Sequence, residues 1–236
     1  MPPLSDLFRA TFRFYRAYAP ILGGYLAWLL IPYTCLTLFQ FVPDGIVKNI
    51  GKAVFEFAAG IMGIWIFIFL SQLIHELIHN RETDPVILRK QTRNLFVPVI
   101  AVGFLYALIV FGGIALLIIP GILFFVWFAL AQLAVILERK RGWEAFTFSK
   151  SLVRGHFFRA AAIIYTGPFV FSAGLMIAVL GIGAVISSIV GLQLFAASNE
   201  APLWLEIIDI LIQLFVMIPL TLIYSIFAYD VLNSRR

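Results

Sequence analysis

The chain consists of long apolar runs separated by short polar segments, and this pattern predicts six membrane-spanning helices. Within a run such as 61–70, polar and apolar side chains do not alternate, which excludes the strands of a membrane β-barrel. A helical span needs roughly 20 predominantly apolar residues. The predicted spans are 18–42, 53–77, 95–118, 121–137, 157–194 and 203–228.

The fifth predicted span, 157–194, is longer than a straight crossing requires. Gly181 and Gly183 lie inside it, and glycine weakens the interior of a helix. Two interpretations therefore stay open, namely one long tilted helix or a shorter span followed by a separate segment within 181–200.

Composition supports a membrane fold. Hydrophobic residues make up 62% of the 236 residues, charged residues make up 12%, and the mean hydropathy is +1.02. Soluble domains average roughly 45–50% apolar and about 25% charged residues. The single cysteine, Cys35, excludes an internal disulfide. We therefore expect an all-α, polytopic integral membrane bundle, and neither a soluble enzyme nor a disordered chain.

Three amphipathic segments, 4–17, 85–94 and 143–154, precede the odd-numbered spans. Together with the spans, they predict three transmembrane hairpins, each preceded by a cytoplasmic surface helix that contacts lipid. Asp84 followed by Pro85 is a typical helix start. The side chains expected at the lipid interface are Arg9, Arg13, Arg16, Arg89, Lys90, Arg93, Trp143, Phe146, Phe148, Lys150 and Arg154.

The distribution of basic residues predicts the orientation. With six spans, one face of the membrane collects both termini and the loops near 78–94 and 138–156, and it holds 15 of the 17 basic residues. Only Lys48 and Lys52 lie on the opposite face. Because cytoplasmic loops are rich in Lys and Arg, both termini should be cytoplasmic. The basic excess is thus a topology signal, and we expect anionic membrane lipids as partners, and no nucleic acid.

His75, Glu76 and His79 match the HExxH pattern, in which two histidines one helical turn apart hold zinc and the glutamate activates water. A catalytic site needs a third protein ligand. The possible donors on the same face are Glu138, Glu144, His156 and Asp230, and none lies in a recognisable third-ligand motif. The sequence therefore predicts no catalytic residue, no bound metal and no cofactor, with a membrane zinc metalloprotease as an alternative.

A small transporter or permease is the other alternative. Polar side chains within spans are functional candidates, and Gln72, Gln132 and Gln213 lie in the second, fourth and sixth predicted spans. A polar cavity centred on them would favour this class, although the chain has no ATP-binding loop.

Further positions form a recognisable pattern. They are Ile118, Ile119, Pro120, Gly121, Ile122, the segment 132–138, Glu144, Ala145, Ser149, Leu152 and Gly155, with 7–20 near the start and Tyr229, Asp230, Leu232 and Arg235 near the end. The pattern resembles the six-span membrane domain associated with some glycerophosphodiester phosphodiesterases. It also resembles prokaryotic membrane proteins that consist of this domain alone.

The resemblance implies a multi-pass protein of the prokaryotic plasma membrane. The soluble phosphodiesterase domain is absent from these 236 residues, so diester hydrolysis is not expected. In this pattern Pro120 and Gly121 should form the outer turn between the third and fourth spans, and Gly155 should end a surface helix. We therefore expect a non-enzymatic protein that organises lipids, a membrane-protein partner or a second copy of itself at the cytoplasmic leaflet.

Overall fold

The structure is a computed structural model that describes residues 3–81, 84–190 and 203–234, all helices, turns and loops without a strand. Six of the described helical segments are long and apolar enough to cross a membrane, which confirms the predicted number. They are Leu4–Phe41, Ile46–Ile78, Pro85–Leu116, Ile118–Glu138, Phe157–Ile186 and Leu203–Asn233.

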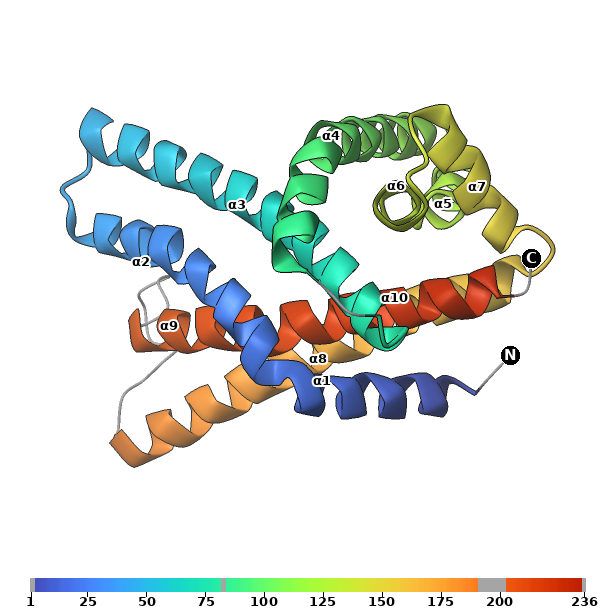
Figure 1. The fold of residues 1–236 in the computed structure, drawn as a ribbon. Helices are drawn as coiled ribbons and strands as arrows, with labels where there is room; N and C mark the ends of the chain where they lie inside the picture. Colours follow the sequence, from blue (N-terminus) through green and yellow to red (C-terminus); the bar gives the residue numbers. More distant parts are fainter. Residues whose placement is uncertain (1–2, 82–83, 191–202, 235–236) are drawn as a thin grey trace.

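Figure 1 shows the order of the elements. The α-helices are α1 (Leu4–Leu26), α2 (Leu30–Leu38), α3 (Ile46–Ile78), α4 (Pro85–Leu116), α5 (Ile118–Trp127), α6 (Ala131–Glu138), α7 (Trp143–Val153), α8 (Phe157–Val190), α9 (Leu203–Ile212) and α10 (Ile218–Asn233). Two 3₁₀ turns, Ala27–Leu29 and Phe39–Phe41, flank α2, and a π-helical turn, Gln213–Met217, joins α9 to α10.

Two of the three predicted surface helices are not separate elements. The segment 4–17 is the first part of α1, and the segment 85–94 is the first part of α4. Neither proline nor glycine lies at the predicted ends of these segments, residues 17 and 94, so each helix continues into the span. Asp84 does cap α4, because its side chain accepts a hydrogen bond from the Val86 N–H at 2.8 Å. Only 143–154 forms a helix of its own, α7.

The α1 segment packs on protein and not only on lipid. Leu7 is 3% exposed and lies in a buried cluster with Ile163 and Phe171 of α8 and Tyr224 of α10. Thr11 is also buried, and its hydroxyl donates to the Leu7 carbonyl at 2.8 Å. Helices α8 and α10 therefore cover part of the apolar face that was expected to contact lipid.

The fifth span is a continuous helix at Gly181 and Gly183, where one of the two interpretations placed a break. Helix α8 passes through Gly181 and Gly183 and continues to Val190. Regular helix satisfies every backbone group in lipid, so two glycines alone do not interrupt it. The last part of the predicted span, 191–194, lies outside the described residues.

The turn between the third and fourth spans differs from the prediction. Leu117 makes the turn with an extended backbone (φ −156°, ψ +131°), and Pro120 and Gly121 lie inside α5. Gly121 instead allows close packing, because a Cβ there would lie 2.6 Å from the Ile114 nitrogen in α4. Gly121 thus allows α4 and α5 to pack in close contact.

The spans do not form a parallel bundle. Figure 1 views α6 nearly along its axis, whereas α3, α8 and α10 run across the picture. Helix α4 bends part-way along its length, and Pro98 lies inside it. Proline removes a backbone hydrogen bond and clashes with the preceding turn, which explains such a bend.

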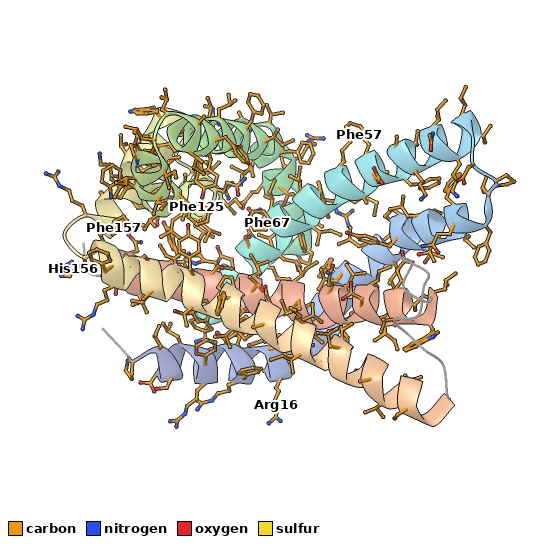
Figure 2. The ribbon with its side chains drawn as sticks, turned by 180° about the vertical axis from the view of Figure 1, so that it is seen from behind. Arg16, Phe57, Phe67, Phe125, His156 and Phe157 are labelled. Atoms are coloured by element: carbon orange, nitrogen blue, oxygen red, sulfur yellow. The ribbon has the colours of Figure 1, made fainter. Side chains whose placement is uncertain are left out.

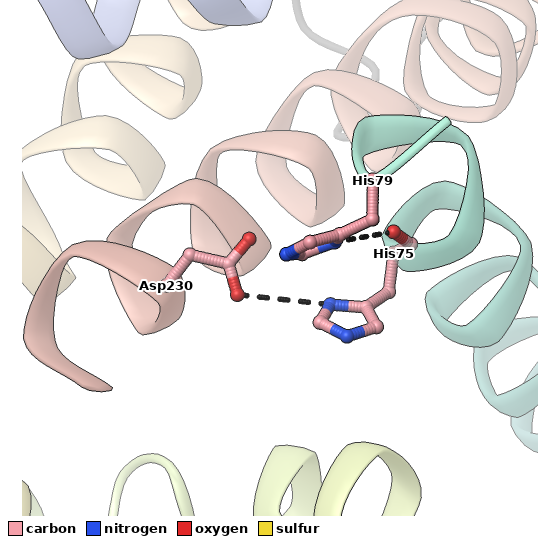
Figure 3. A group of neighbouring side chains, drawn as sticks. All are labelled: His75, His79 and Asp230. Atoms are coloured by element: carbon pink, nitrogen blue, oxygen red, sulfur yellow. Dashed lines mark hydrogen bonds and ion pairs between the residues drawn. The ribbon is translucent and has the colours of Figure 1, made fainter. Parts of the chain in front are cut away.

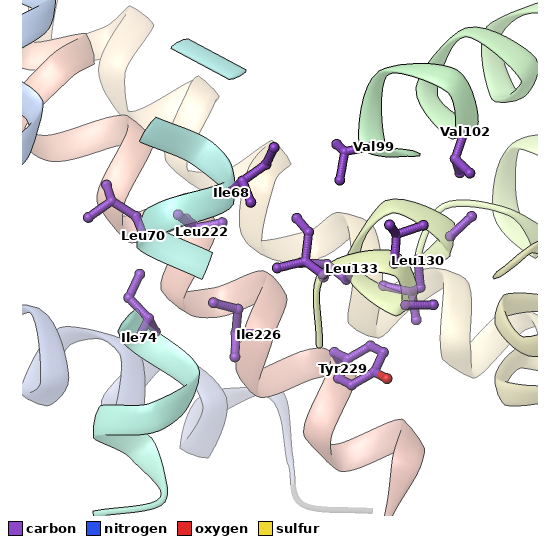
Figure 4. Packing of buried hydrophobic residues seen from close by; sticks show 14 of the residues in the cluster. Ile68, Leu70, Ile74, Val99, Val102, Leu130, Leu133, Leu222, Ile226 and Tyr229 are labelled. Carbon is purple, nitrogen blue, oxygen red and sulfur yellow. The ribbon is translucent and has the colours of Figure 1, made fainter. Parts of the chain in front are cut away.

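The main core lies where α3, α4, α6 and α10 meet (Figure 4). The fully or almost fully buried side chains there include Ile68, Leu70, Ile74, Val99, Val102, Leu130, Leu133, Leu222, Ile226 and Tyr229. This cluster brings the end of the second span against the end of the sixth.

The charge distribution makes a prediction about orientation that reporter fusions can test. The start of α1 and the end of α10 lie at one end of the molecule in Figure 1, and the α2–α3 loop lies at the other. Fusions after Arg81 or Arg141 should report a cytoplasmic location, and fusions near Asp44 or Glu200 an external one. Glu200 lies outside the described residues. The reverse pattern would overturn the topology.

Candidate functional site

The fourth span is broken in its middle. Helix α5 ends at Trp127, α6 begins at Ala131, and the intervening turn leaves backbone groups without their helical partners. Tyrosine hydroxyls satisfy one of them, because Tyr106 and Tyr165 both donate to the Phe125 carbonyl, at 3.2 and 2.8 Å. Irregular backbone at membrane depth is tolerated only when protein groups or a cavity satisfy it.

Ser149 of α7 satisfies two more of these groups. Its hydroxyl donates to the Trp127 carbonyl at 2.7 Å and accepts from the Leu130 N–H at 3.2 Å. The serine side chain is fully buried. Helix α7 therefore holds the break in its present form.

The sixth span is irregular at a similar place. The π-helical turn Gln213–Met217 comes directly before α10, in which Pro219 is the second residue. Single π turns inside α-helices are frequent at functional sites. The Gln213 side chain, in this π turn, donates to the Asp209 carboxylate one turn earlier, at 3.5 Å.

A cavity of about 940 Å³ lies between the spans, and both irregularities line it. Its walls come from all six spans and are mainly apolar. The polar side chains on the walls include Tyr106, Gln132, Tyr165, Asp209 and Gln213. A largely apolar cavity with a few polar groups, of roughly 300–1,000 Å³, is the usual form of a site for a small organic ligand.

The cavity has two of the three glutamines that would favour a transporter. Gln72 lies elsewhere, in a hydrogen-bonded network that joins α3, α4 and Arg139, the residue after α6. It donates to the Thr92 hydroxyl at 3.0 Å and accepts from Arg139 at 3.3 Å. Arg139 also donates to Gln91, and burial lowers the pKa of its guanidinium. Sequence reasoning missed this role because a basic residue after a span was interpreted as a topology signal.

A second cluster lies at the end of the second span, where the HExxH pattern occurs (Figure 3). His75 lies on the last turn of α3, His79 directly follows that helix, and Asp230 of α10 faces them. One donor atom from each residue lies within 4.8 Å of the other two. The His75 Nδ1 atom is 3.6 Å from the Asp230 Oδ1 atom. Of the four donors that the sequence offered, the structure brings Asp230 to the histidines.

The two other acidic candidates for the third ligand interact with different residues, and so does Glu76 of the HExxH motif. Glu138 accepts hydrogen bonds from Tyr229 at 2.9 Å and from Asn233 at 3.2 Å. Glu144 pairs with Lys140 at 2.6 Å. Glu76 lies 3.7 Å from Arg81. The remaining donor, His156, is exposed and points away from the helices in Figure 2.

The predicted lipid contacts divide into two groups. All eight basic side chains are exposed, as Arg16 shows in Figure 2, and Trp143 is 65% exposed. Phe146 and Phe148 are buried, at 0% and 9% exposure, because α7 packs that face on the core of the protein. The prediction that these two rings anchor α7 in lipid is therefore wrong.

Gly155 follows α7 with a φ of +88°, a backbone conformation that favours glycine.

Comparison with family models, with curated proteins and with solved structures finds no match to this chain. The resemblance to the six-span membrane domain therefore rests on the sequence pattern alone.

Proposed function

We propose that the protein is a non-enzymatic, lipid-binding protein of a prokaryotic plasma membrane. A lipid acyl chain occupies the cavity between the spans, and the exposed basic side chains attract anionic lipid at the cytoplasmic leaflet. The observation that carries the proposal is the 940 Å³ cavity, because its mainly apolar walls match hydrocarbon.

The backbone irregularities support binding in this cavity. The break in span four and the π turn in span six both form part of its wall. Regular helix would satisfy the backbone of both spans at no cost, whereas the break needs three hydroxyl groups from α4, α7 and α8. Retained irregularities of this kind are typical of binding sites between membrane helices.

The exposed basic residues support the choice of leaflet. Arg9, Arg13 and Arg16 are exposed on α1, Lys150 is exposed on α7, and Arg154 is exposed directly after α7. Each Lys or Arg near an anionic membrane surface contributes on the order of 1 kcal/mol of attraction. Several such residues on one face would enrich anionic lipid next to the protein.

Filling the cavity should displace the lipid. Gly63 lines the cavity, and a Cβ there meets no atom within 4 Å, so a Gly63→Leu side chain extends into the space that the acyl chain takes. We expect native mass spectrometry after gentle extraction to show lipid on the unaltered protein. In Gly63→Leu the ratio of lipid-bound to lipid-free protein should be at least about tenfold lower, a loss of about 1.4 kcal/mol.

Gly60→Leu is the matched control. Gly60 lies on the exposed side of the same helix, also with open space around it, so the substitution adds the same side chain outside the cavity. It should keep the bound lipid. A chain that carries no lipid before substitution, or equal loss from both variants, would contradict the proposal.

A permease is the second candidate, because Gln132, Asp209 and Gln213 give the cavity wall polar groups. In that case the cavity would hold a polar solute during transport. Proteoliposomes in which Gln132→Leu leaves the bound lipid unchanged but abolishes solute uptake would favour this class over lipid binding.

A further inference from the structure

We propose that His75, His79 and Asp230 form a binding site for a divalent transition-metal ion that joins the end of α3 to α10. The site is separate from the cavity, whose walls include none of these three residues. Its ligand set is two imidazole nitrogens and one carboxylate oxygen, a combination that suits Zn²⁺ and other late first-row ions.

Hydrogen bonding sets the tautomer of His79. Its Nδ1 atom lies 2.9 Å from the His75 carbonyl oxygen, and a carbonyl can only accept. Nδ1 therefore carries the proton, which leaves the lone pair on Nε2 available to a metal. Metal-binding histidines commonly donate their second ring nitrogen to a carbonyl in this way.

The other two residues present polar atoms that no protein group satisfies. His75 Nδ1 and Asp230 Oδ2 are buried and have no hydrogen-bond partner among the described residues. Buried polar atoms are normally paired, so such atoms point to a missing ligand. His75 Nδ1 and Asp230 Oδ1 form only a long ion pair, at 3.6 Å.

The spacing of the donor atoms is close to that of a metal site. Ligand atoms about 2.0–2.1 Å from a tetrahedral zinc ion lie about 3.3 Å from one another. The His75–Asp230 separation of 3.6 Å is near this value, and all three atoms lie within 4.8 Å of one another. A small rotation of exposed His79 closes the remaining gap.

Carboxylates near the three residues favour a cation, although Arg81 also lies near His75. Glu138 lies near enough to interact electrostatically with both His75 and Asp230. Glu76, which activates water in HExxH hydrolases, forms an ion pair with Arg81 instead. The arrangement therefore supports a metal that fastens two spans together, and not a hydrolytic centre. The sequence favoured no metal because it identified no third ligand, and the fold supplies one.

Metal titration of the purified 236-residue chain in detergent tests the proposal. After treatment with a chelator and its removal, the protein should bind about one Zn²⁺ or Co²⁺ per chain. His75→Ala, His79→Ala and Asp230→Asn should each weaken binding at least about tenfold. Only variants that remain helical by circular dichroism and monodisperse by gel filtration enter the comparison.

Two substitutions serve as controls. His156→Ala removes the remaining histidine of the chain, and Glu76→Gln alters the same motif without removing a proposed ligand. Both should bind the metal as the unaltered protein does. Absence of stoichiometric binding, or unchanged affinity in folded Asp230→Asn, would overturn the site and leave an ordinary His–Asp ion pair. Gly63→Leu should leave metal binding unchanged, so the two proposals fail independently.

Discussion

Replacing Gly121 by alanine should destabilise the protein by about 3 kcal/mol, the upper part of the range for overpacking a closely packed site. The added Cβ would lie 2.6 Å from the Ile114 nitrogen and 2.8 Å from its Cα atom. These are backbone atoms of α4, so a rotamer change cannot relieve the clash, and α4 and α5 must separate. Gly113, on the α4 side of the same contact, is less tightly confined, since a Cβ there would lie 3.0 Å from the Gly121 Cα atom.

The midpoint of thermal unfolding in detergent, followed by circular dichroism, should fall by about 6–12 °C for Gly121→Ala, at about 2–4 °C per kcal/mol for a chain of this size. Gly112→Ala is the control. Gly112 is exposed, and a Cβ there meets no atom within 4 Å. Its replacement should leave the midpoint unchanged or raise it, because alanine favours helix by about 1 kcal/mol. Equal midpoints for the two variants would refute the close contact between α4 and α5.

Replacing Ser149 by alanine should cost about 2–6 kcal/mol. The substitution leaves the Trp127 carbonyl and the Leu130 N–H without the partner that holds the break in span four. Each buried polar group left unsatisfied costs about 1–3 kcal/mol. The loss should be local at first, because the hydroxyls of Tyr106 and Tyr165 still hold the Phe125 carbonyl.

Hydrogen exchange measures this local effect directly. The amide of Leu130 should exchange faster in Ser149→Ala, and the midpoint of thermal unfolding should fall. Ser151→Ala is the control, because the exposed Ser151 hydroxyl donates only to the Phe148 carbonyl of its own helix, at 2.7 Å. Its stability should stay within about 0.5 kcal/mol of the unaltered protein. If Ser149→Ala exchanges no faster at Leu130, then the serine does not support the break.

Local patterns in the sequence were sufficient for the number and type of the spans. A run of about 20 apolar residues has one stable form in lipid, so six runs determine six helices. The Asp84 cap and the exposed polar face of α7, from Glu144 to Arg154, also depend only on near neighbours. The orientation follows from charge counts and remains a prediction for the fusions to test.

The tertiary structure decided the features on which function depends. Nothing in the segment 128–130 marks a break, since it contains neither glycine nor proline, and the hydroxyls that support the break come from three other helices. The burial of Phe146 and Phe148 follows from packing on the core and not from their periodicity, which fits a membrane anchor equally well. Asp230 was one of four possible donors until the fold placed α10 against the end of α3. Contacts between residues far apart in the chain are set by how whole helices pack, and hydropathy and spacing along one helix do not encode that packing.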